Sequence, residues 1–199
     1  MSSPPTSSPG LAASLLGVLF TPRRTLARLA LEDSAKPGAS AIALLALFWS
    51  VLLVWLWMQG HAPAFVLLPI PLEHYYLAQA LVMLPVLTGL WWVHAELSHR
   101  LATRAGGEGR EPGVRAALGF AYAAPMLAHV LAELAATLAG GVDALRLTAR
   151  ISLPAASLAV WVLSSLALRV AHRTSWPASV GAAFAGLLVQ ALLGALVLR

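Results

Sequence analysis

The sequence predicts an all-α fold: a polytopic membrane helix bundle of five transmembrane helices, preceded by a short amphipathic interfacial helix. Hydrophobic residues make up 59% of the chain and charged residues only 11%, and the mean hydropathy is +0.79. These values lie far from the composition of a soluble domain. The apolar residues form five stretches, each close to the ~20 helical residues that cross a hydrocarbon core ~30 Å thick. The predicted spans are residues 38–58, 75–93, 116–138, 151–170 and 178–198.

Little of the chain is left for a soluble domain, so residues 11–199 are predicted to form a single membrane domain. Residues 1–10 (MSSPPTSSPG) are rich in Ser and Pro and lack apolar periodicity, which is typical of a disordered tail. The apolar run 11–20 is too short to span, and its arginines follow it, so we expect no cleaved signal peptide. Cysteine is absent, which excludes disulfides and thiolate metal sites.

The segment before the first span is predicted to lie on the membrane surface. Thr21 and Pro22 are a typical helix start, because Thr can cap free N–H groups and Pro is tolerated at the first helical position. Arg23, Arg24 and Arg28 follow among polar neighbours, with leucines on the other side. We expect an interfacial helix whose arginines lie near the phosphates of anionic lipid headgroups. The alternative is a linker helix packed under the bundle.

The placement of the basic residues predicts the orientation of the bundle, because Lys and Arg are biased toward the cytoplasmic ends of spans. With the N-terminus in the cytoplasm, ten of the 13 Lys and Arg residues lie inside. The opposite orientation inverts this ratio, so the C-terminus is expected outside. Charge at span ends, without a basic face, argues against a nucleic-acid partner despite the net charge of +5.

Polar residues on the third span give the clearest functional hypothesis, because charge at membrane depth is costly. Tyr122, Met126, His129 and Glu133 are separated by four, three and four residues and so follow one helical stripe. One interpretation is that His129 and Glu133 handle a proton or cation, completed by residues 73–74 from the second span. The interpretation that the sequence favours places Glu133 ~10 Å beyond the span centre, as a solvated carboxylate near the outer headgroups.

A second polar cluster, HAELSHR, lies at the predicted cytoplasmic end of the second span. His94, Glu96 and His99 are ligand types for a divalent metal. Their spacing turns the two imidazole rings apart on a helix, and no His-x-x-x-His motif occurs. We therefore predict no metal site and a solvated helix end. His172 is likewise expected to be a solvated loop residue.

The fifth span carries small residues at helical spacing. Gly186, Gln190 and Gly194 recur every four residues. Small residues let helix backbones approach closely, and a buried amide can hydrogen-bond across the contact. We expect this face to pack inside the bundle, with self-association as the alternative.

Motifs for catalysis are missing from the sequence. It contains no Gly-x-Ser-x-Gly, no His-Glu-x-x-His and no phosphate-binding Gly loop. The prediction is a protein that is not an enzyme and needs no cofactor.

Two segments resemble a known family. The opening LLGVLFTPRRTLARLA (residues 15–30) is similar to the entry segment of Yip-domain proteins, the Ypt/Rab-interacting-protein-like integral membrane proteins. ALGFAYAAPMLAHVL (residues 117–131) resembles the small-residue, Tyr and Pro pattern of the same family, onto which Tyr122 and Pro125 map. The resemblance implies a multispan membrane protein without known catalysis. Eukaryotic members are linked to vesicle trafficking and small GTPases.

The Ala- and Leu-rich composition indicates a bacterial member, so no GTPase partner is carried over. We expect a scaffold or adaptor for other membrane proteins, or for a second copy, in the bacterial inner (cell) membrane. The alternative is a small transporter or permease subunit whose path is lined by the polar stripe on the third span. Transporters contain broken helices or internal repeats, and no convincing repeat is present.

Overall fold

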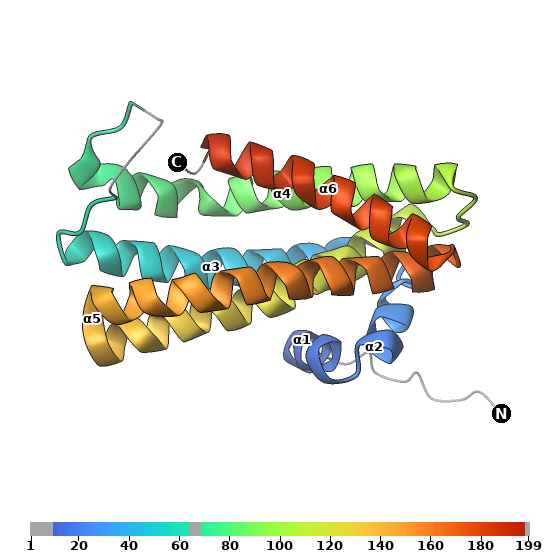
Figure 1. The fold of residues 1–199 in the computed structure, drawn as a ribbon, viewed down its shortest axis with the longest axis horizontal. Coiled ribbons are helices and arrows are strands. Elements are labelled where there is room, and N and C mark those ends of the chain that lie inside the picture. The colour runs from blue at the N-terminus through green and yellow to red at the C-terminus, as the bar shows by residue number, and fades with distance from the viewer. Residues whose placement is uncertain (1–9, 64–68, 198–199) are drawn as a thin grey trace.

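The computed structural model describes residues 10–63 and 69–197, and within these ranges it contains helices but no strand (Figure 1). Four helices are long and apolar enough to cross a membrane, by length and composition. They are α3 (Lys36–Met58), α4 (Tyr75–Arg104), α5 (Glu111–His172) and α6 (Trp176–Val197). Shorter elements are α1 (Leu11–Phe20), α2 (Pro22–Leu29) and η1 (Leu72–His74). The predicted all-helical class is confirmed. The expected disordered tail lies outside the described residues, except for Gly10.

The longest helix, α5, folds back on itself. A straight helix of 62 residues would be ~93 Å long. The backbone leaves helical geometry at Gly141 (φ 68°, ψ −158°), and Figure 1 shows α5 doubling back. His129 Nδ1 lies 2.8 Å from Ser152 Oγ, although 23 residues would separate them by ~35 Å along a straight helix. Residues 111–140 and 142–172 are therefore two antiparallel limbs.

Helix ends differ from the predicted spans mainly in the connections. The expected loop at residues 139–150 is reduced to the break at Gly141. The helix α4 continues to Arg104 instead of ending near residue 93, and it runs through Pro85. Because polar side chains beyond residue 93 contact other helices, α4 can continue past the predicted end of the second span.

The helices α3 and α5 cross where both carry glycine. A Cβ atom added to Gly119 would lie 2.6 Å from Gly38 Cα, and one added to Gly38 would lie 2.9 Å from Ala116 Cα. Ala117 and Ala121 beside this crossing are fully buried. The small residues of the segment 117–131 thus let two backbones touch.

The N-terminal helices pack against the bundle differently from the prediction. Leu26 and Leu29 on α2 are fully buried, and α2 packs against α5. A Cβ on Gly113 of α5 would overlap the Ala30 carbonyl. The prediction of an interfacial apolar face is wrong for α2, because that face is covered by protein, as in the linker alternative. The helix α1 lies crosswise to the bundle (Figure 1) and exposes the apolar side chains of Leu16, Leu19 and Phe20.

Candidate functional site

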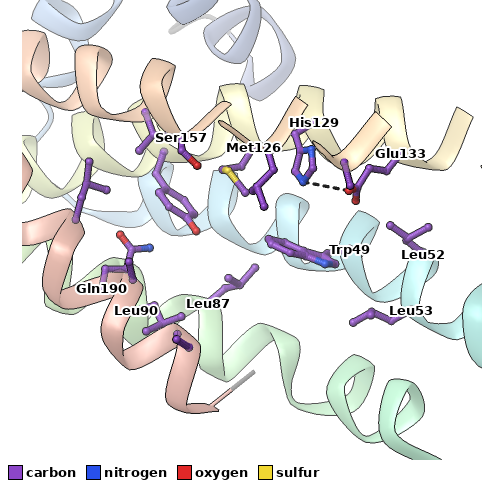
Figure 2. Close-up of a pocket in the computed structure, with 18 of the residues that line it drawn as sticks. Trp49, Leu52, Leu53, Leu87, Leu90, Met126, His129, Glu133, Ser157 and Gln190 are labelled. Atoms are coloured by element: carbon purple, nitrogen blue, oxygen red, sulfur yellow. Dashed lines mark ion pairs between the residues drawn. The ribbon is translucent and has the colours of Figure 1, made fainter. Parts of the chain in front are cut away.

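A cavity of about 780 Å³ lies between α3, α4, both limbs of α5 and α6. Figure 2 shows most of the side chains that line it. One part of the wall is aliphatic, and it includes Leu52, Leu53, Leu87, Leu90 and Val160. The other part is polar and consists of Tyr122, His129, Glu133, Arg146, Ser157 and Gln190. Such a wall fits a molecule with an apolar body and a polar group.

The polar lining is elongated along the bundle. Arg146 lies five residues after the break at Gly141, and Tyr122 lies nineteen residues before it. At ~1.5 Å per residue, the polar groups cover roughly 20 Å of the bundle's length. The sequence-predicted stripe of Tyr122, Met126, His129 and Glu133 lines this cavity in full. Glu73 is not brought to it, because that residue is exposed in η1 and pairs with its neighbour His74.

The centre of the polar wall is a buried pair. His129 Nε2 lies 3.4 Å from Glu133 Oε1, and the two side chains are only 3% and 10% exposed (Figure 2). The edge of Trp49 on α3 meets the His129 ring at 6.5 Å between centroids. The expectation of a solvated carboxylate at Glu133 is wrong, because α3 and the second limb of α5 cover this face of the helix.

The hydrogen bonds around His129 determine how many protons the pair holds. Ser152 Oγ donates its hydrogen to the Thr148 carbonyl at 2.8 Å. The Ser152 oxygen must then accept the bond from His129 Nδ1. A neutral ring with hydrogen on Nδ1 has a bare Nε2, which would repel the carboxylate oxygen opposite. One shared proton between His129 and Glu133 removes this repulsion, and the pair is then neutral overall.

The cavity wall also carries an acceptor that lacks a donor among the described residues. Gln190 is 4% exposed and hydrogen-bonds with Tyr122, but within the described residues its Oε1 has no hydrogen-bond partner. Both ring nitrogens of His129 are engaged. Because a buried acceptor without a partner costs ~1–3 kcal/mol, the site favours a ligand that donates hydrogen bonds.

The fifth-span residues lie on the inner face of α6. A Cβ on Gly186 would overlap Ser98 Oγ and lie 2.8 Å from His94 Nδ1, both on α4. A Cβ on Gly194 would meet Leu90 Cδ1 at 3.5 Å, which is an ordinary contact. Gln190 lies between these two glycines and faces the cavity. The small residues place α6 against α4, and the amide completes the cavity wall.

The three metal-ligand types named in the sequence, His94, Glu96 and His99, have separate partners in the structure. His94 is fully buried, with Ser98 Oγ at 3.5 Å and Ser164 Oγ at 3.4 Å. Glu96 instead pairs with Arg100 and Arg115. The expectation of a solvated helix end is wrong for His94, because α5 and α6 cover it. Among the described residues, no group of three or more His, Asp or Glu side chains could hold a metal ion.

His172 is also buried, although the sequence placed it in a solvated loop. It is the last residue of α5 and is 1% exposed. Its Nδ1 accepts a hydrogen bond of 3.0 Å from the Gly109 N–H, and its Nε2 lies 3.1 Å from His99 Nδ1. The loop between α4 and α5 thus folds onto His172. These partners are 63 and 73 residues away, so no local pattern marks them.

The three basic residues predicted to lie near lipid phosphates have separate roles. Arg28 turns toward α1 and donates to Ser14 Oγ at 2.8 Å. Arg24 is exposed to solvent. Arg23 lines a second, smaller hollow next to the ends of α5 and α6. The structure therefore leaves only part of this set free for an anionic headgroup.

No known protein-family model, curated protein or solved structure matches this chain. The resemblance to Yip-domain proteins rests on the two sequence segments alone. Of the residues that map onto the pattern of that family, Tyr122 lines the cavity and Pro125 is buried in the first limb of α5.

Proposed function

We propose that the chain is an integral membrane protein that binds an amphipathic amine in its cavity and exchanges it for a proton, as a small transporter does. One observation carries the proposal: the buried His129–Glu133 pair, with room for one shared proton, lines a largely apolar cavity. The scaffold role implied by the Yip-like segments requires no such cavity. It stays an expectation from the sequence, and the transporter alternative fits the geometry better.

The exchange conserves charge within the cavity. The ammonium group of the ligand donates to the Glu133 carboxylate and to Nε2 of His129 in place of the shared proton, which leaves to water. His129 stays neutral, with its Nδ1 hydrogen on Ser152. One positive charge enters and one leaves, so the cavity never holds an unpaired charge. Burying an unpaired charge at this depth would be costly.

An anionic ligand fits the cavity less well. Both nitrogens of His129 are already engaged, so this ring has no donor to spare. The other basic group, Arg146, is 71% exposed and pairs with Asp143. The remaining acceptors, on Glu133 and Gln190, would repel a carboxylate. A donor-bearing cation therefore matches the wall.

The proposal includes five spans, because the two limbs of α5 would cross the membrane separately. α3, α4 and α6 are the other three. The end of the bundle that carries α1 and α2 lies opposite the α5 turn (Figure 1). We place it in the cytoplasm of a bacterial cell, and the C-terminus outside, because most of the basic residues gather there. They are Arg23, Arg24, Arg28, Lys36, Arg100, Arg104, Arg110, Arg115, Arg169 and Arg173.

A cysteine label in the cavity tests the binding site. The natural chain has no cysteine, so Ser157→Cys introduces a single thiol into the cavity wall (Figure 2). In nanodiscs, its rate of modification by a methanethiosulfonate reagent is measured by mass spectrometry. Phenylbutylamine should slow the modification, whereas phenylbutanol and phenylbutyrate, which share its apolar body, should not. Ser165→Cys, buried on the same limb, should stay unmodified throughout.

The role of the carboxylate is tested in the same background. Glu133→Gln should abolish protection by phenylbutylamine, and the proton release that a pH indicator detects on binding should disappear. Glu73→Gln removes an exposed carboxylate and serves as the matched control, with no effect expected. Equal protection by all three probes, or protection that survives Glu133→Gln, would refute the proposal.

A further inference from the structure

A second hollow lies at the end of the bundle that carries the N-terminal helices. It has a volume of about 540 Å³ and is formed by α2, the end of α5 and the start of α6. Arg23, Arg169 and Arg173 supply its charge. Its remaining lining is apolar and consists of Ala27, Leu166, Val170 and Trp176. Three guanidinium groups beside an aliphatic surface match a molecule with an anionic head and a hydrocarbon chain.

The charge of this hollow is not neutralised by the protein. In the described part of the chain, none of the three arginines forms an ion pair. Three acidic groups at this end pair elsewhere: Glu96 and Glu111 with Arg115, and Asp33 with Arg110. A triply basic hollow at a membrane surface attracts the headgroups of anionic lipids.

Two features hold the arginines in place. The Arg169 guanidinium lies over the Trp176 ring, 5.0 Å from its centroid. Arg173 follows α5 with φ 57°, and its N–H donates to the Arg169 carbonyl at 2.9 Å. Glycine is the usual residue in this left-handed conformation. Arg173 thus places a long basic side chain at a position that usually favours glycine.

We propose that this hollow binds the phosphate of an anionic phospholipid, with the guanidinium groups of Arg169, Arg173 and Arg23 around the phosphate and an acyl chain along Leu166 and Val170. Guanidinium groups suit phosphate because they donate two parallel hydrogen bonds. The exposed apolar side chains of α1 lie at the same end of the bundle, where they would reach the lipid surface. The site is separate from the cavity and rests only on the proposed membrane placement of this end.

Native mass spectrometry of the full chain in detergent tests the site. Wild type should bind phosphatidylglycerol more tightly than phosphatidylcholine. Arg169→Gln and Arg173→Gly should each weaken phosphatidylglycerol binding about fivefold. Arg173→Gly relieves the left-handed backbone, so its loss of lipid cannot come from unfolding; its melting temperature is measured alongside. Arg24→Gln, an exposed arginine on the same helix as Arg23, is the matched control and should bind as wild type does.

The other outcomes each overturn the proposal. Equal binding of the two lipids would mean that the charge is not used. An equal loss in Arg24→Gln would indicate attraction by the whole basic surface and not by this hollow. Displacement of the lipid by millimolar inorganic phosphate would identify a free phosphate as the ligand. None of these readouts depends on Glu133, so a failure of the cavity proposal leaves this test unaffected.

Discussion

Replacing Gly186 by alanine is the most direct test of how α4 and α6 pack. The added methyl group would overlap Ser98 Oγ and lie 2.8 Å from His94 Nδ1 and 3.0 Å from the His94 carbonyl oxygen. Neither neighbour can yield easily. Ser98 Oγ donates to the Ala182 carbonyl at 3.2 Å, and His94 is completely buried. The helices must separate, or the hydrogen bonds around His94 must break.

The expected loss of stability follows from these contacts. Overpacking a well-packed core by one methylene costs ~1–3 kcal/mol, and each interhelical hydrogen bond lost within a membrane bundle adds ~0.6 kcal/mol. Alanine regains ~1 kcal/mol of helix propensity over glycine. The net destabilisation is about 0.6–2.6 kcal/mol. At ~2–4 °C per kcal/mol for a chain of this size, Gly186→Ala should lower the melting temperature by about 1–10 °C.

Thermal unfolding of the purified protein in detergent measures this effect. Gly181→Ala on the same helix is the control, because a Cβ there meets nothing within 4 Å. It should leave the melting temperature unchanged or raise it slightly. Gly194→Ala, with Leu90 Cδ1 at 3.5 Å, should fall between the two. If Gly186→Ala melts at or above the temperature of Gly181→Ala, the close approach of α4 and α6 is wrong.

Three further predictions concern the turn, the topology and the loop between α4 and α5. Gly141→Ala should destabilise the protein by about 1–3 kcal/mol, because φ 68° with ψ −158° is open almost only to glycine; a melting temperature equal to that of wild type would contradict the turn. Single cysteines at Ala62 and Glu108 should be labelled by an impermeant thiol reagent from opposite sides of a vesicle, and labelling from one side would refute the proposed arrangement. His172→Ala should speed hydrogen exchange at the Gly109 amide, which now donates to the imidazole, and unchanged exchange would mean that the loop is held by other contacts.

The long helices could be predicted from the sequence because length and hydropathy are local properties. The first predicted span, residues 38–58, differs from α3 by two residues at its start. The connection between the α5 limbs was predicted less well. The gap between two predicted spans implied a loop at residues 139–150, yet Asp143 and Arg150 lie within the second limb. Charged residues near a membrane surface can stay helical, because their side chains reach water while the backbone keeps its hydrogen bonds.

The candidate site was predictable only where a single helix supplies it. The spacing from Tyr122 to Glu133 places four residues on one face whatever the rest of the chain does. Whether Glu133 is wet or buried depends on Trp49 and Ser152, which other segments bring to it. Sequence spacing carries no information on such partners. Distance from the span centre therefore suggested a solvated carboxylate, and packing between segments decided otherwise.

The buried histidines differ in what their partners allow. His94 is held between two serine hydroxyls, and His172 between a backbone N–H and another imidazole. These partners satisfy a neutral ring and leave no place for a counterion. Among the buried histidines of the described chain, His129 alone faces a carboxylate, and Glu133 also borders the cavity. In the proposed exchange, a proton leaves there as a cation enters, without burying net charge, whereas protonation of His94 or His172 would break a hydrogen-bonded contact between helices. The same residue type thus holds helices together at two positions, and the proposed function uses it at the third.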